Sequence, residues 1–308
     1  MSGDADPGDH VGMGIRNVNV GIDHSECAAG ALAWAGELTA AVAADLRAVS
    51  AWQLPLVAMM PETVGSLPTD DFMQEQTDAL LTKVTTEAGL ADRCELLAIE
   101  GPAGPVLSDQ TAPESLVVLG RHGSGQHHGV ARLVDFILGS AAHHTVHHAS
   151  GPVAVVPPGT TWTDAPTVVI GMDGSPSAAE ALAWAVDSLP TDARLVAVRT
   201  IIPWAGDPLA PIDASFDPTV VGKAKTELRG WIADVVAGCE RSDREVHADV
   251  EIGAARWTLT NPDLGADILV VGHRGRTGIT ARVLGSVADH VVRHAHVPAI
   301  VVRGTAGA

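Results

Sequence analysis

GIDHSECAAGALAWA at residues 21–35 returns almost unchanged at 171–185 as GMDGSPSAAEALAWA. The two segments agree at ten of fifteen positions with a constant offset of 150, and shorter matches follow in the same order along both halves. LGS at 138–140, for example, reappears at 284–286. A repeat with so long a period indicates a duplicated domain, and 308 residues are enough for two domains that each bury their own core.

The repeat also predicts where the domains begin and end. Residues 1–15 are rich in Gly and Asp and predict a flexible tail. The first domain is then expected at 16–156 and the second at 167–308. Between them, PPGTTWTDAP at 157–166 has the Pro- and Thr-rich composition of a linker.

Each half alternates short β-branched runs with longer segments that carry apolar residues at helical spacing. Five strands joined by helical crossovers imply an α/β fold, in which each domain is a doubly wound five-stranded parallel sheet flanked by helices, with the order 3-2-1-4-5. Ser177 and Glu180 have the spacing of a capping box at the start of a helix. The predicted strands are 16–22, 45–51, 93–99, 115–120 and 152–156 in the first half, and 167–172, 195–201, 246–252, 267–272 and 298–303 in the second.

The last strand of each half predicts how the halves associate. PVAVV at 152–156 and PAIVV at 298–302 would lie at sheet edges, and unprotected edges pair with one another. We therefore expect these strands to pair copy with copy within the chain, or chain with chain in a homodimer.

The composition disfavours several classes of protein. Aromatic residues make up 3% of the chain against 46% hydrophobic residues, so the core must consist of small aliphatic side chains, as in parallel α/β sheets. The net charge of −18, without a basic cluster, disfavours nucleic acid and anionic membranes as partners. No apolar run is long enough to cross a bilayer and no signal peptide is evident, so we expect a cytoplasmic protein.

The sequence after the fourth strand of the second half has the spacing of a phosphate-binding site. Gly272 and Gly275 leave backbone N–H groups open to an anion, and Gly285 and Ser286 follow after nine residues, at the start of a helix. A helix N-terminus and a hydroxyl would then face the same anion. Each part alone also has a structural explanation, because strand-to-helix turns often use glycine and Ser286 could be a helix N-cap.

Together, these residues form the pattern G-x2-G-x9-G-[ST], which resembles the phosphate-binding motif of the ATP-binding universal stress proteins. The resemblance extends over both halves and implies a tandem-domain member of that family. It also implies nucleotide contacts at the end of the first strand, where Gly171 and Asp173 stand, and adenine contacts near Thr200 at the end of the second. The first and fourth strands are neighbours in such a sheet, so Asp173 and Gly272 would flank one crevice. Alternatively, Asp173 could cap the following helix.

The first half carries the same motif with a longer loop. Fifteen residues, in place of nine, separate Gly123 from Gly139, so six residues are inserted. A longer loop costs little closure entropy and can still bring its glycines to a phosphate, although it could also displace or bury the site. We expect nucleotide in both halves. The expected first-half site consists of Gly21, Asp23, Ala51, Gly120, Gly123, Gly139 and Ser140.

Histidines near the motifs offer an alternative kind of site. A spacing of four residues places two rings on one face of a helix, where a metal could bind. Matching histidines follow both motifs, so they look like equivalent helix positions of the repeat, and we expect packed or solvated histidines and no metal site. The histidines concerned are His127 and His128 in the inserted loop, His143, His144, His147 and His148 after it, and His290 and His294 in the second half.

Motifs of catalysis are missing from the sequence. We find no Walker A sequence, GxSxG elbow or HExxH helix, and no obvious nucleophile with a base. We therefore expect a nonenzymatic, ATP-responsive regulator of stress adaptation or growth, with Mg²⁺ beside the triphosphate and Asp173 and Ser286 as its oxygen ligands. Two alternatives stay open: a slow ATPase or nucleotidyl-transfer enzyme on the same fold, and a structural dimerisation module that has lost nucleotide.

Overall fold

The computed structural model describes residues 14–54, 69–121, 138–202, 218–275 and 284–303. All ten predicted strands are present, and their ends lie no more than one residue from the predicted positions. The predicted α/β fold class is therefore confirmed. In the same ranges, no helix is both long enough and apolar enough to cross a membrane.

Two successive sets of elements follow the repeat of the sequence. The first domain contains β1 (Asn17–Gly21), α1 (Glu26–Val42), β2 (Asp45–Trp52), α2 (Asp70–Glu87), β3 (Cys94–Glu100), α3 (Ala103–Asp109), β4 (Ser115–Gly120), α4 (Ser140–His148) and β5 (Val153–Val156). The second contains β6 (Thr167–Gly171), α5 (Pro176–Ser188), β7 (Arg194–Ile201), α6 (Pro218–Val236), β8 (Val246–Ile252), α7 (Ala255–Leu259), the 3-10 turn η4 (Pro262–Leu264), β9 (Ile268–Gly272), α8 (Ser286–His294) and β10 (Ala299–Val302).

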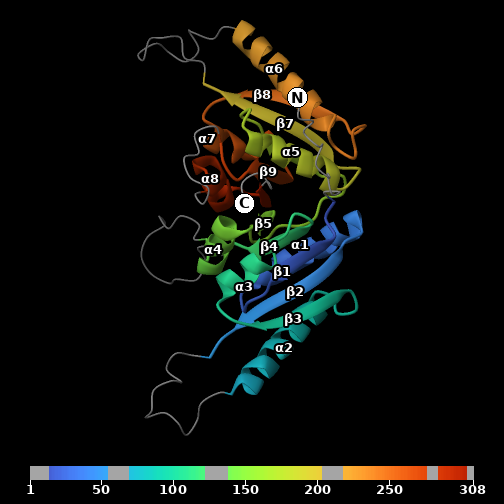
Figure 1. Cartoon of the computed structure of the whole chain (residues 1–308), viewed down its shortest axis with the longest axis vertical. Helices are drawn as coiled ribbons and strands as arrows, with labels where there is room; N and C mark the ends of the chain where they lie inside the picture. The colour runs from blue at the N-terminus through green and yellow to red at the C-terminus, as the bar shows by residue number, and fades with distance from the viewer. Residues whose placement is uncertain (1–13, 55–68, 122–137, 203–217, 276–283, 304–308) are drawn as a thin grey trace, which may run out of the picture.

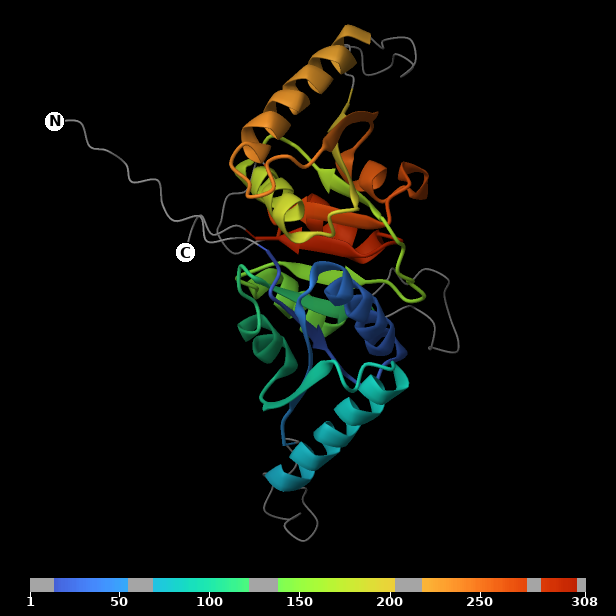
Figure 2. The ribbon, with the colours of Figure 1, turned by 90° about the vertical axis from the view of Figure 1, so that its right-hand side faces the viewer.

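The strands of both domains form one sheet. Each domain contributes five parallel strands, in the orders β3-β2-β1-β4-β5 and β8-β7-β6-β9-β10, which is the predicted 3-2-1-4-5 in both. Strands β5 and β10 pair antiparallel, with Ile300 opposite Ala154, so the sheet has ten strands (Figure 1). The predicted edge strands thus pair copy with copy within the chain. The two domains are related by an approximate two-fold axis at this seam, with α2 and α6 at opposite ends (Figure 2).

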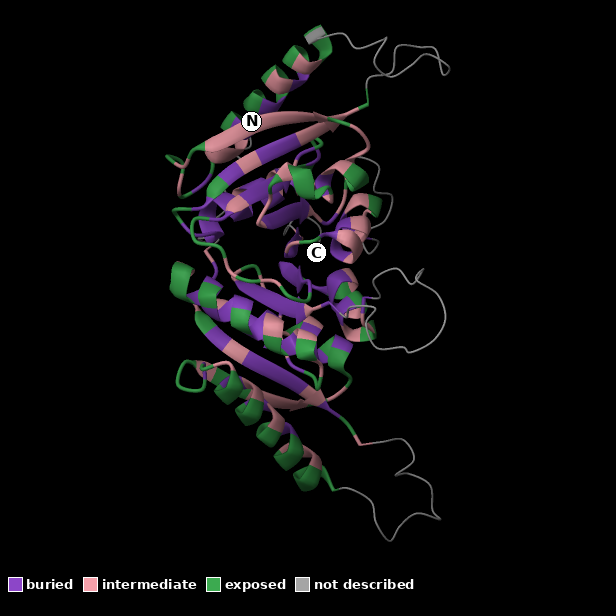
Figure 3. Ribbon diagram, turned by 180° about the vertical axis from the view of Figure 1, so that it is seen from behind, coloured by how far each residue is buried: buried purple, intermediate pink, exposed green. Residues whose placement is uncertain are grey.

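The core covers both faces of the sheet. On one face, Trp34 of α1 and Trp184 of α5 pack among aliphatic side chains and are only 3% and 2% exposed. The other face packs valines of the central strands against α3, α4, α7 and α8. All residues of β5 and β10 are buried, so the core continues from one domain into the other (Figure 3).

Helix α5 begins one residue before the predicted capping box. Its N-cap is Ser175, whose hydroxyl accepts from the N–H of Ala178 at 3.2 Å, and Pro176 occupies the first helical position, where its fixed φ is favourable. The prediction that Ser177 and Glu180 form the capping box is therefore wrong. Both side chains belong to the functional site described below.

Because the seam is buried, we expect the two domains to stay together after the linker is cut. A protease recognition sequence inserted after Gly159, where no atom lies within 4 Å of an added Cβ, should yield fragments that co-elute in size-exclusion chromatography. The same cleavage in an Ile300→Asp variant should release the fragments, because this side chain is 0% exposed and an unpaired buried charge is strongly unfavourable. Separation of the fragments without the Asp substitution would contradict the pairing.

Candidate functional site

The carboxyl ends of β6 and β9 carry the main residues of the predicted site. These strands are neighbours in the second domain, with Asp173 shortly after β6 and Gly275 shortly after β9. A Cβ atom added to Gly275 would lie 2.8 Å from Oδ2 of Asp173, so the carboxylate faces the backbone of the glycine directly. The structure therefore brings together the two segments that the motif requires to meet.

The start of α8 closes the same turn. The N–H of Gly285 donates to the carbonyl oxygen of His273 at 2.9 Å. A Cβ added to Gly285 would lie 3.5 Å from the backbone nitrogen of Gly275. Gly285 is the N-cap of α8 and Ser286 its first residue, without a side-chain capping hydrogen bond. The N-terminal N–H groups of a helix, which lack partners within the helix, therefore open beside Gly275.

Asp173 is not the N-cap of α5, which was the alternative role predicted for it, although it does bind the N-cap residue. Its Oδ1 accepts from the N–H of Ser175 at 2.9 Å, which fixes the turn, but the N-cap is Ser175 itself. Asp23 is held in the same way in the first domain, where its Oδ1 accepts from the N–H and the hydroxyl of Ser25 at 2.9 and 2.5 Å. Both carboxylates are thus oriented by the loop that follows the first strand of their domain.

Arg274, Ser177 and Ser175 hold the Gly272–Gly275 turn against α5, and none of them was among the predicted site residues. The N–H of Arg274 donates to the hydroxyl of Ser177 at 3.2 Å, and the hydroxyl of Ser175 donates to the carbonyl oxygen of Arg274 at 3.5 Å. Burial raises the pKa of Glu180, which the positive charge of Arg274 opposes. Nε of Arg274 also donates to Nδ1 of His273 at 3.2 Å. In the sequence, the position of Arg274 inside the G-x2-G turn was the one indication of its role. Its contacts could not be predicted, because Ser175 and Ser177 belong to the start of α5.

Four of the predicted site glycines have a packing reason of their own. A Cβ on Gly272 would lie 2.4 Å from the carbonyl oxygen of Ser177, and one on Gly120 would lie 2.5 Å from that of Cys27. These glycines let α5 and α1 approach β9 and β4 closely. Gly171 and Gly21 lie against leucine side chains, with Cβ contacts of 3.1 and 2.7 Å. Gly275 and Gly285 are the motif glycines that border the site itself.

The first-domain residues occupy matching places as far as the structure describes them. Gly139 is the N-cap of α4, again without a side-chain capping bond, and Ser140 is its first residue. Gly123, with His127 and His128, lies outside the described residues. The two positions assigned to adenine lie near the carboxyl ends of the second strands, Thr200 opposite Glu251 in β8 and Ala51 opposite Ile99 in β3.

The histidine pairs stack along their helices. The rings of His143 and His147 lie 4.1 Å apart, and Nδ1 of His147 is 2.8 Å from the carbonyl oxygen of His143. His144 with His148 and His290 with His294 repeat this geometry. Within the described residues, no group of three or more His, Cys, Asp and Glu side chains is arranged to hold a metal ion.

Fold and site together define a tandem pair of doubly wound α/β domains with a glycine-rich turn facing an aspartate. The model of the universal stress protein family matches the chain twice, over residues 14–157 and 165–303. The chain therefore belongs to the universal stress protein family.

Relatives of this family match over large parts of the chain. A universal stress protein of Mycolicibacterium smegmatis is 32% identical over 202 residues, which are 64% of each chain. One from Mycobacterium tuberculosis is 26% identical over 307 residues, 92% of this chain and 94% of its own. A solved universal stress protein from Archaeoglobus fulgidus has a TM-score of 0.63 at 19% identity, over 93% of this chain and 98% of the other. That structural likeness supports the fold.

Because Gly272 is needed for packing, replacing it should destabilise the domain even without ligand. We expect Gly272→Ala to lower the free energy of unfolding by roughly 1–3 kcal/mol, since the new methyl group meets backbone atoms. The control, Gly222→Ala, lies in α6 with nothing within 4 Å of its Cβ and should stabilise the helix slightly. Urea unfolding followed by circular dichroism measures both, and equal midpoints for the two variants would contradict this role.

His273 should make stability depend on pH. Burial, together with the charges of Arg303 and Arg274, lowers the pKa of His273 from 6.5 to about 4. Between these values the unfolded chain binds a proton that the folded chain does not, so stability falls as pH decreases from 6.5 towards 4. We expect melting curves of the His273→Gln variant to fall less steeply over this range. Parallel curves for variant and wild type would show that His273 titrates normally.

Proposed function

We propose that this protein binds ATP in the crevice between Asp173 and the Gly272–Gly275 turn and acts as a nucleotide-responsive regulator of stress adaptation or growth. The observation that carries the proposal is the direct approach of the Asp173 carboxylate to Gly275, beside the open N-terminus of α8. A triphosphate there would receive backbone N–H groups and the positive end of the helix dipole. Arg274 adds a cation in a chain whose net charge is −18.

Mg²⁺ is the divalent ion that suits this crevice. Magnesium in proteins prefers one or two carboxylate or hydroxyl oxygens and shares its other positions with phosphates and water. Asp173 and Ser286 would supply those oxygens from the two sides of the crevice. The ion would offset the negative charges of the triphosphate beside the aspartate.

The first domain supports the same proposal with its own residues. Asp23 is oriented by Ser25, and α4 begins at Ser140 with the same open N-terminus as α8. We propose that this domain binds a second nucleotide.

Binding without turnover is favoured over catalysis by the surroundings of His273, the histidine within the motif. Its Nδ1 accepts from Nε of Arg274 at 3.2 Å, and its Nε2 lies 2.5 Å from Nη2 of Arg303. Both ring nitrogens thus face guanidinium groups, and the low pKa of the ring keeps it neutral. A slow ATPase that uses Asp173 as its base is the second candidate, because this carboxylate borders the proposed phosphate position.

The direct test is the nucleotide that the purified protein carries. We expect mass spectrometry of the extracted ligand to find ATP, and the ATP to stay unchanged for hours at 25 °C. Conversion to ADP with a steady turnover would instead favour the ATPase.

A variant at Gly275 separates the nucleotide-binding function from a purely structural one. Gly275→Val places a branched side chain against the Asp173 carboxylate, and we expect calorimetry to show at least a tenfold loss of ATP affinity in the second domain. The matched control is Gly230→Val in α6, where an added Cβ meets nothing within 4 Å. Equal ATP affinity in the two variants would favour a module without a nucleotide role.

A further inference from the structure

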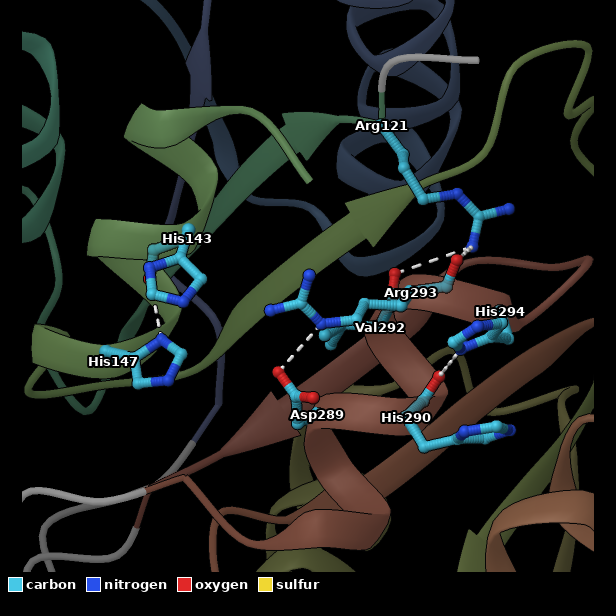
Figure 4. Close-up of polar contacts among 8 residues, drawn as sticks. All are labelled: Arg121, His143, His147, Asp289, His290, Val292, Arg293 and His294. Atoms are coloured by element: carbon cyan, nitrogen blue, oxygen red, sulfur yellow. Dashed lines mark hydrogen bonds and ion pairs between the residues drawn. The ribbon is translucent and has the colours of Figure 1, made fainter. Parts of the chain in front are cut away.

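Arg121 crosses from the first domain into the second. It follows Gly120 at the end of β4, and its side chain is only 2% exposed. Its Nη1 donates to the carbonyl oxygen of Arg293 at 2.8 Å and to that of Val292 at 3.4 Å (Figure 4). Both carbonyls lie in the last turn of α8, where helix carbonyls have no partner within the helix.

A second contact reaches from the second domain into the first. His273 holds the position of Arg121 in the other domain, directly after the glycine that ends the fourth strand. Its Nε2 contacts Nη2 of Arg303, which donates to the carbonyl oxygen of His147 at 2.7 Å. His147 lies in the last turn of α4, at the position that Arg293 has in α8. The two contacts are therefore equivalent across the seam.

Each of these helices connects the two candidate sites. Helix α8 begins at Ser286 in the second-domain motif and ends on Arg121, which belongs to the first-domain motif. Helix α4 begins at Ser140 in the first-domain motif and ends on Arg303, the partner of His273 in the second. Nine residues of helix form a stiff rod of about 13 Å. A short rigid element thus links one motif to the other in each direction.

The arginine contact resists separation because it is buried. A cation at a helix C-terminus is stabilised by the helix dipole, and charged donors form the stronger hydrogen bonds. Burial lowers the pKa of Arg121 to about 10, so the guanidinium remains charged at neutral pH. If α8 moved away from Arg121, the buried guanidinium would lose the carbonyl oxygens of Val292 and Arg293 as hydrogen-bond acceptors, which is unfavourable. The contact is therefore suited to pass a displacement of α8 on to the turn at Gly120.

We propose that the two nucleotide sites are coupled, so that filling one changes the affinity of the other through Arg121 and α8 and through Arg303 and α4. This inference rests on the proposed function, because it requires nucleotide in both domains. A phosphate at the N-terminus of α8 acts on the helix whose other end Arg121 holds. Linkage makes the effect equal in both directions, and couplings of this kind change affinity by about 5- to 150-fold.

The experiment compares the intact chain with chains that keep one site. ATP with Mg²⁺ is titrated by calorimetry into the wild type and into Asp23→Ala and Asp173→Ala, which report the intrinsic affinity of each remaining site. The coupling factor is the product of the two wild-type binding constants divided by the product of the two intrinsic constants. We expect a factor of at least about 5 in the wild type.

The crossing arginines are then replaced in the same backgrounds. In Arg121→Met and in Arg303→Met, either of which tests the link should the other fail to fold, we expect the factor to fall towards 1. The control is Arg47→Met, which removes a partly exposed arginine whose Nε lies 2.8 Å from Glu95 on the outer strands. That variant should keep the wild-type factor, and thermal unfolding confirms that each protein is folded.

The outcomes distinguish this inference from the proposed function. Independent sites in the wild type, occupation of one domain only, or a factor unchanged in both arginine variants would overturn the coupling while leaving ATP binding intact. Absence of ATP binding in the wild type would overturn both. Loss of coupling in the arginine variants, with coupling retained in Arg47→Met, supports the link.

Discussion

Strands β5 and β10 would each be an exposed edge in an isolated domain, and their antiparallel pairing removes both edges at once. The side chains of this pair are buried on both faces of the sheet, so the two cores merge into one. The same pairing fixes the two-fold relation of the domains and brings α4 and α8 to the seam. In the part of the chain that the structure describes, this is the strand pair that joins the domains, so the printed contacts of Arg121 and Arg303 across the seam depend on that placement.

Within each domain, the strand order determines where the candidate site lies. The first strand lies between the second and the fourth, so the strand order reverses there. In sheets of this kind, ligands bind at the carboxyl ends of the strands at that point. The close approach of α5 to β9, which Gly272 permits, then brings the hydroxyls of Ser175 and Ser177 to the turn at Arg274. Packing and site geometry are thus set by the same helix, and a substitution that loosens one disturbs the other.

The sequence predicted the fold closely because its signals are local. Strand ends, the duplication and the spacing of Gly275 and Gly285 depend on periodicity and on turn residues, which a single chain displays directly. The cap at Ser175 was missed because two serines compete within three positions, and Pro176 decides between them. The contacts of Arg121 and Arg303 could not be foreseen, since each depends on a helix of the other domain. Whether the predicted residues bind nucleotide stays a prediction.

The two halves have diverged at the seam in a way that preserves one contact. Arg121 follows the fourth strand of its domain, whereas Arg303 follows the fifth strand of the other, where the first domain has Pro157. Despite this change of position, each guanidinium reaches the equivalent carbonyl at the end of the opposite helix. The two halves therefore share the contact and not the residue position. A dimer of identical single domains must use the same residue on both sides, while a fused pair can adjust each link separately. The tandem chain therefore permits two links that use different residue positions and still end on equivalent carbonyls of α4 and α8.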